Sequence, residues 1–234
     1  MRLSKFFPVF FSFVLFTTLN AYCEISDSLK TVRVGIYQYK PLIDFENSKQ
    51  PTGLFIDLLQ DIAKKNNWKI IYTKGSWQDN LNMLKTGKID LVLGIVMNKN
   101  RAEEFNITKE PVISSWVQIY AKDNASKNTI LDLDKKTIVG LSGNAYLKAF
   151  KESVQNFNIH PIFIEKENID DVFRTVKESG ADYAVSERIA GLSYKDKYNL
   201  YETPIMLAPN GVGFGTTKGK NNDLIASIDQ YLIS

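Results

Sequence analysis

The sequence predicts an α/β protein built from two similar units, each with strands and helices in alternation. That alternation runs twice along the chain, on either side of a polar stretch at residues 122–128. The clearest example is residues 87–101, in which a glycine ends a helix, an apolar run follows, and a loop carries one arginine. This order of elements is typical of largely parallel sheets with right-handed crossovers.

The first unit is expected to contain three strands and two helices. The strands are residues 31–36, 69–72 and 89–96, which are rich in β-branched and other apolar side chains. The first helix has an apolar stripe at helical spacing, made by Leu54, Phe55, Leu58, Leu59, Ile62 and Ala63. The second helix begins at Ser76, since Asp79 stands three residues later as in a capping box, and its apolar face includes Trp77.

The second unit repeats the pattern. Its strands are residues 137–141, 162–164 and 182–185. Ser142-Gly143-Asn144 opens one helix, and Asn168 with Asp171 caps the next. Extended chain at residues 200–215 then leads to a last helix, whose apolar face is Leu224, Ile225, Ile228 and Leu232.

The N-terminus indicates export. A basic start is followed by apolar residues 6–17 and a short small or polar stretch, the layout of a secretory signal peptide over residues 1–23. The apolar run is shorter than the ~20 residues that a transmembrane helix needs. Cleavage is expected after Ala21 or Cys23. Lipid attachment at Cys23 is disfavoured because Tyr22 stands where a lipoprotein signal has a small residue.

Composition excludes several classes of function. Cys23 and His160 are the only cysteine and histidine, so disulfides, cysteine or histidine metal clusters and a Ser-His-Asp triad are excluded. After removal of the signal segment, the chain has 27 basic and 26 acidic residues. A nearly neutral protein without a basic stripe is not expected to bind nucleic acid. No cofactor and no metal are expected.

Arg101 is the first candidate for ligand binding. Ligands of open α/β sheets lie beyond the carboxyl ends of strands, and Arg101 follows the strand at residues 89–96. Gly94 in that strand would let the backbone pass close to a ligand. A guanidinium can bind a carboxylate through two hydrogen bonds. The alternative is a surface arginine that pairs with Glu103 or Glu104.

Several short motifs, in order, resemble the bacterial extracellular solute-binding proteins of family 3. They are Tyr39-Lys40-Pro41-Leu42, Thr52-Gly53-Leu54-Phe55-Ile56-Asp57-Leu58, Leu84-Lys85-Thr86-Gly87-Lys88-Ile89-Asp90, Arg101 with Phe105, Val139-Gly140-Leu141 before Gly143, and Ala181-Asp182-Tyr183-Ala184-Val185. The resemblance covers the chain from Val32 to its end. It implies a class II periplasmic binding protein fold, with two lobes, a hinge and a cleft between the lobes.

The resemblance also implies a division into lobes. Lobe one would comprise residues 25–121 plus 209–234, and lobe two residues 122–208. The hinge strands would lie near residues 121–124 and 207–211. The implied function is capture of a small carboxylated solute in the periplasm, with an amino acid as the favoured class. The binding protein would be a monomer that delivers the solute to an inner-membrane ABC permease.

The family's amino-acid binders imply a role for each matching residue. Arg101 would hold the ligand carboxylate and Glu187 the ammonium, while Trp77 and Tyr39 would form aromatic walls. The remaining contacts would come from Gly94, Ile95, Val96, Gly143, Asn144 and Ala145. Trp77 and Tyr39 could instead be core or loop packing, Gly143 a simple turn glycine, and Glu187 a partner of Arg188 or of a surface lysine.

The departures from the family pattern fall around the ligand. Ala145 lacks the usual threonine hydroxyl, Ile95 and Val96 replace hydroxyl residues, and Glu187 replaces an aspartate. Two other functions therefore stay open. One is a sensory protein of the same fold without transport, and the other is a dehydratase-like enzyme that uses Glu187 as a general acid. Binding without catalysis is the favoured prediction.

Overall fold

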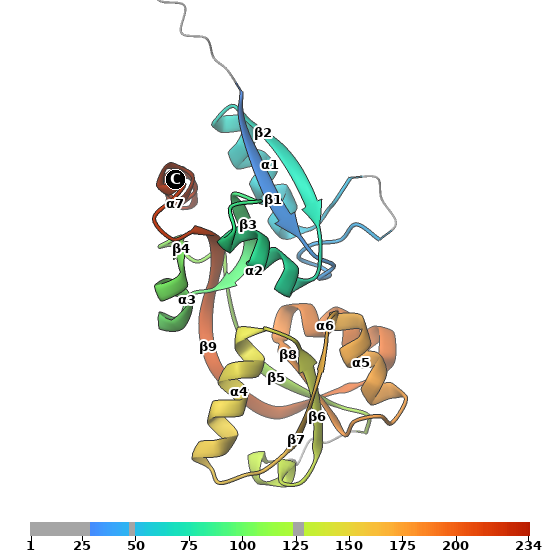
Figure 1. Ribbon diagram of the computed structural model, residues 1–234. Coiled ribbons are helices and arrows are strands. Elements are labelled where there is room, and N and C mark those ends of the chain that lie inside the picture. Colours follow the sequence, from blue (N-terminus) through green and yellow to red (C-terminus); the bar gives the residue numbers. More distant parts are fainter. Residues whose placement is uncertain (1–28, 47–49, 124–128) are drawn as a thin grey trace, which may run out of the picture.

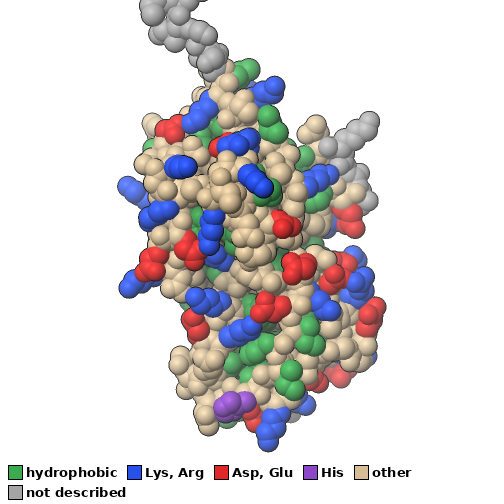
Figure 2. All heavy atoms as spheres, in the orientation of Figure 1, with side chains coloured by type: hydrophobic (Ala, Val, Ile, Leu, Met, Phe, Trp, Pro, Cys, Tyr) green, Lys and Arg blue, Asp and Glu red, His purple; other side chains and the backbone are tan. Residues whose placement is uncertain are grey.

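In the computed structural model, the described residues are 29–46, 50–123 and 129–234. They form an α/β protein with two bodies, one above the other in Figure 1. The predicted signal segment lies outside the described residues. No helix within the described ranges is long and apolar enough to cross a bilayer. Lysine, arginine and acidic side chains are interspersed on the face seen in Figure 2, without a large patch of one sign.

The upper body contains the first predicted unit. Strand β1 (Lys30–Ile36) pairs in parallel with β2 (Trp68–Lys74) and β3 (Leu91–Val96). Around them lie α1 (Leu54–Lys65), α2 (Trp77–Lys85), α3 (Lys99–Glu104), β4 (Phe105–Ile107) and the C-terminal α7 (Asn222–Leu232). The expected capping box forms at the start of α2, between Ser76 and Asp79.

The lower body contains the second predicted unit. Its strand β6 (Thr137–Leu141) pairs in parallel with β7 (Ile162–Lys166) and β8 (Tyr183–Glu187). The surrounding helices are η1 (Ile130–Leu133), α4 (Ala145–Asn156), α5 (Ile169–Lys177) and α6 (Arg188–Tyr198). Asn168 caps α5 as expected, and that helix buries Ile169, Val172, Phe173 and Val176.

Two long strands connect the bodies. They are β5 (Ile113–Ala121) and β9 (Tyr201–Thr217), which pair antiparallel with each other. The hydrogen-bonded strand order is β2-β1-β3-β9-β5-β8-β6-β7, so the sheets of both bodies are continuous through these crossing strands. The upper part of β9 pairs with β3, and the lower part of β5 pairs with β8.

The strand pairing shows that the chain passes from the upper to the lower body earlier than the sequence predicts. Residues 117–121 pair with β8 and therefore lie in the lower body, whereas the sequence predicts that the first lobe continues to residue 121. The sequence also predicts the connection between the units at residues 122–128, of which 124–128 lie outside the described residues. The chain instead crosses earlier, where residues 113–115 pair with residues 210–212 of β9. The second crossing thus lies close to the predicted residues 207–211.

Gly53 offers a test of the loop that leads into α1. Its φ of 114° is rare for any residue with a side chain, and a Cβ there would lie 2.6 Å from the carbonyl oxygen of Leu42. We expect Gly53→Ala to lower the free energy of unfolding by about 2 kcal/mol or more. The matched control is Gly87→Ala, at φ 72° with no atom within 4 Å of the new Cβ, for which about 1 kcal/mol is expected. Urea unfolding followed by circular dichroism measures both, and equal losses would contradict the steric argument.

Candidate functional site

A cavity lies between the two bodies, close to the crossing strands. The upper body supplies residues from the loop after β1, from α1, from the start of α2 and from β3, while the lower body supplies the beginnings of α4 and α6. The lining residues are Tyr37, Tyr39, Leu42, Phe55, Trp77, Gly94, Val96, Ile113, Asn144, Ala145, Tyr146, Glu187 and Val212. Its volume of about 20 Å³ is close to that of a single water site. A solute can therefore enter only when the bodies move apart.

Aromatic rings form the upper wall of this cavity. The Tyr37 ring lies 5.1 Å from the Tyr39 ring and 5.0 Å from the Trp77 ring, measured between centroids. All three side chains are at least nine-tenths buried. Such a wall presents π-faces and apolar surface to a ligand, with hydroxyl groups at its edge.

Gly94 allows the wall to pack against β3. Its φ is 83°, and a Cβ on this residue would lie 3.0 Å from the Phe55 ring and 3.2 Å from the Tyr37 hydroxyl. The register of β3 with β9 shifts at the same point, between Leu93 and Ile95. In the structure, the groups that come close to Gly94 are aromatic side chains, and the close approach of a ligand stays a prediction.

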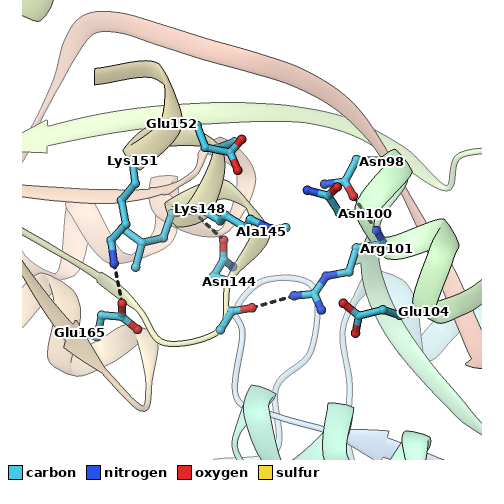
Figure 3. A pocket seen from close by; sticks show the side chains of 13 residues that line it. Asn98, Asn100, Arg101, Glu104, Asn144, Ala145, Lys148, Lys151, Glu152 and Glu165 are labelled. Carbon is cyan, nitrogen blue, oxygen red and sulfur yellow. Dashed lines mark hydrogen bonds and ion pairs between the residues drawn. The ribbon is translucent and has the colours of Figure 1, made fainter. Parts of the chain in front are cut away.

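Arg101 reaches from α3 to the lower body. Asn98 caps this short helix by accepting a hydrogen bond from the Arg101 backbone N–H at 2.9 Å. The guanidinium donates from Nη2 to the carbonyl oxygen of Gly143 at 2.7 Å, as Figure 3 shows. Trp77 Nε1 donates to the same oxygen at 3.2 Å. Two side chains of the upper body thus meet one carbonyl group of the lower body.

The alternative role for Arg101 was a surface ion pair with Glu103 or Glu104, and the structure has Arg101 on the Gly143 carbonyl instead. Glu104 pairs instead with Lys85, at 2.6 Å. Burial lowers the pKa of Arg101, and the charge of Glu104 opposes that shift, but an arginine keeps its charge in proteins. A guanidinium with one donor on Gly143 has further N–H groups available for an anion.

The Gly143 loop opens α4. Gly143 has a φ of 66°, and a Cβ there would meet the Gln78 side chain at 2.1 Å. The Asn144 side chain caps the helix and accepts from the backbone N–H groups of Tyr146 (2.7 Å) and Leu147 (3.3 Å). The Asn144 N–H itself donates to Leu141. The backbone N–H of Asn144, one of the predicted ligand-binding residues, is therefore engaged inside the loop.

Glu187 stands at the start of α6, where it caps the helix. Its side chain accepts from Ser115 Oγ and from the backbone N–H groups of Ile189 (3.0 Å) and Ala190 (2.5 Å). The residue is 3% exposed. Burial raises the pKa of this carboxyl group, and the three hydrogen bonds oppose the shift. Its alternative partner, Arg188, lies instead over the Trp116 ring.

The tyrosine hydroxyls around Glu187 stay neutral. Burial raises the pKa of Tyr37, Tyr39 and Tyr146, and the negative charge of Glu187 adds to the effect on each of them. These groups can therefore donate and accept hydrogen bonds but do not carry charge at neutral pH.

Most of the predicted site residues meet at this cavity. Tyr39, Trp77, Gly94, Val96, Asn144, Ala145 and Glu187 line it. Ile95 does not, because its side chain packs against Gly215 of β9. Arg101 and Gly143 line an adjoining pocket of about 340 Å³, together with charged side chains of α4 such as Lys148 and Glu152 (Figure 3). Asn144 and Ala145 border both spaces, so one ridge separates Arg101 from Glu187.

Sequence reasoning missed several lining residues, including Tyr37, Ile113, Tyr146 and Val212. Tyr146 directly follows Ala145, and Tyr37 stands two residues before Tyr39, so both lie just outside the motifs that carry the resemblance. Ile113 and Val212 pair with each other where β5 and β9 cross between the bodies. Their place follows from antiparallel pairing of distant segments, for which no local pattern exists.

Comparison with known proteins agrees with this architecture. Residues 32–233 match the model of the bacterial extracellular solute-binding proteins, family 3. A probable histidine-binding protein of Campylobacter jejuni is 30% identical over 67% of this chain and 64% of its own length. A putative amino-acid ABC transporter-binding protein of Vibrio harveyi, PatH, is 24% identical over 76% and 69%. The chain thus spans less than two thirds of the Campylobacter protein.

Solved structures share the fold. A histidine kinase sensor domain similar to periplasmic binding proteins superposes with a TM-score of 0.77 at 21% identity, over 88% of this chain and 90% of that one. The ancestral amino-acid-binding protein AncCDT-1, a precursor of cyclohexadienyl dehydratase, gives 0.75 at 26% identity, over 87% and 88%. The arginine-bound, truncated form of ArgBP from T. maritima gives 0.76 at 20%, over 88% and 97%.

The family match extends from β1 to the end of α7 and includes both bodies, the crossing strands and the cavity between them. The two-lobed α/β fold with a cleft is the one predicted from the motif order. The chain therefore belongs to the bacterial extracellular solute-binding proteins of family 3.

Proposed function

We propose that this protein binds an amino acid in the periplasm and delivers it to an ABC permease. One observation carries the proposal: a cationic Arg101 and a buried acidic Glu187 lie on opposite lobes, Glu187 in the aromatic-lined cavity and Arg101 in the pocket that adjoins it. A zwitterion has complementary charges at its two ends. The names of the Campylobacter and Vibrio relatives support the same solute class.

Lobe closure follows from this arrangement. The division into lobe one (up to about residue 112, plus 212–234) and lobe two (about 116–208) is our proposal, with the crossing segments of β5 and β9 as the hinge. A ligand that contacts Arg101 on one lobe and Glu187 on the other makes both contacts only in the closed state. Such a ligand shifts the population toward closure.

A thermal-shift screen tests the function. The mature protein is heated alone and with each L-amino acid, among which L-histidine, L-arginine and L-glutamine come first. A ligand at 100 times its Kd stabilises the folded state by about 2.7 kcal/mol, so the melting temperature should rise by several degrees. If no L-amino acid shifts it at millimolar concentration, amino-acid binding is excluded.

A dehydratase-like reaction is the second candidate, because Glu187 is a buried carboxyl group with a raised pKa, as a general acid requires. The hydrogen bonds from Ser115, Ile189 and Ala190 argue against it, since they favour the ionised form. We therefore infer binding without turnover. Incubation with prephenate-like acids, followed by ultraviolet absorbance of an aromatic product, should give no more product than the buffer alone.

A further inference from the structure

One buried hydroxyl group in the cavity makes no hydrogen bond to any residue that the structure describes. The Tyr146 side chain is 3% exposed, and its hydroxyl makes no hydrogen bond within the described part of the chain. Buried polar groups of folded proteins are almost always paired, because an unpaired one loses its bonds to water without replacement. A buried hydroxyl that faces a binding cavity thus points to a polar group of the ligand.

The position of Tyr146 sets which end of a ligand it would meet. It lies in the first turn of α4 and lines the cavity beside Glu187. Burial raises the pKa of the Tyr146 hydroxyl, the charge of Glu187 adds to that shift, and the Ser115 side chain opposes it. Ser115 in turn donates its own proton to Glu187. The hydroxyl therefore belongs to the acidic end of the cavity, away from Arg101.

Glu187 alone offers few contacts to a cation. A carboxylate has about four acceptor positions, and Ser115, Ile189 and Ala190 occupy three of them. The charge of Glu187 also acts on the Tyr37 and Tyr39 hydroxyls of the cavity. Of the three tyrosines, Tyr146 is the one whose fully buried hydroxyl makes no hydrogen bond within the described residues. An ammonium group has three N–H donors, so a second acceptor is required at this end.

We propose that Tyr146 is a specificity-determining residue that accepts a hydrogen bond from the ligand ammonium while Glu187 accepts another. The inference rests on the proposed function and names the group that distinguishes amino acids from simple carboxylic acids. The Tyr146 hydroxyl can then donate its proton to Ser115 Oγ, which already donates to Glu187. Each of these three side chains then has a hydrogen-bond partner. A carboxylic acid without the amine leaves Glu187 and Tyr146 unmatched.

The test compares Tyr146→Phe with the wild type. Titration calorimetry first uses whichever of L-histidine, L-arginine and L-glutamine binds the wild type tightest. The second ligand is the same acid without its α-amino group, whose affinity is measured by displacement of the first ligand. We expect Tyr146→Phe to weaken the amino acid about 10-fold and the des-amino acid less than about twofold. The control is Tyr201→Phe, whose side chain is half exposed and outside the cavity; it should change neither affinity.

Each result bears on a different claim. If the wild type binds no amino acid, the proposed function fails and this inference fails with it. If the wild type binds but Tyr146→Phe retains full affinity, or loses both ligands equally, only the role of Tyr146 is overturned. A lower melting temperature of ligand-free Tyr146→Phe would also overturn it, because removal of an unpaired hydroxyl should not destabilise the protein.

Discussion

Arg101→Lys is expected to weaken amino-acid binding by about 2–5 kcal/mol, the range for a charge pair that closure removes from water. The guanidinium already donates to Gly143 at 2.7 Å, and its other N–H groups can bind a carboxylate in a planar, bidentate manner. A lysine has one nitrogen for both tasks. It must either leave the Gly143 carbonyl or hold the ligand by a single bond.

Titration calorimetry with the best amino acid measures the loss. Arg174→Lys is the matched control, because Arg174 pairs with Asp171 on the exposed face of α5, far from the cavity. Wild-type affinity in Arg101→Lys would rule out a ligand contact for Arg101. An equal loss in Arg174→Lys would show that the effect comes from net charge or stability and not from the site.

The order of elements could be predicted because each is encoded locally. Helical spacing of apolar residues, the Ser76 capping box and the apolar run before Arg101 each fix one element without reference to the others. The predicted strand at residues 89–96 is slightly long, since β3 is Leu91–Val96. Ile89 is nevertheless buried, so the hydrophobic pattern was right and only the backbone pairing starts later.

The site was predicted less completely, because its geometry depends on contacts between distant segments. The pairing of β5 with β9 brings Ile113 to Val212, and the pairing of β5 with β8 brings Ser115 close to Glu187. Neither pair has a signature in the sequence. The Arg101–Gly143 contact likewise depends on how the two bodies meet. Resemblance to a family supplied positions such as Glu187, but not the partners that make this carboxylate a helix cap as well as a candidate ligand group.

Glu187→Gln is expected to weaken amino acids by about 2–3 kcal/mol, the loss for a hydrogen bond to a charged group, while des-amino acids keep their affinity. The amide oxygen of glutamine can still accept from one of the two backbone N–H groups that cap α6, but the negative charge that attracts an ammonium is gone. Glu178→Gln is the control, because Glu178 is an exposed residue at the end of α5. Equal losses for both ligand classes would show that Glu187 does not distinguish the ammonium.

The raised pKa of Glu187 adds a pH dependence with a definite sign. A protonated carboxyl does not attract an ammonium, so wild-type affinity for amino acids should fall as the pH is lowered through this raised pKa. The hydroxyls that face Glu187, those of Tyr37, Tyr39 and Tyr146, stay neutral over that range because their pKa values are raised as well. Glu187→Gln should therefore lose the pH dependence together with the affinity. A variant that keeps the same pH profile would assign the titration to another group and remove the ammonium contact from Glu187.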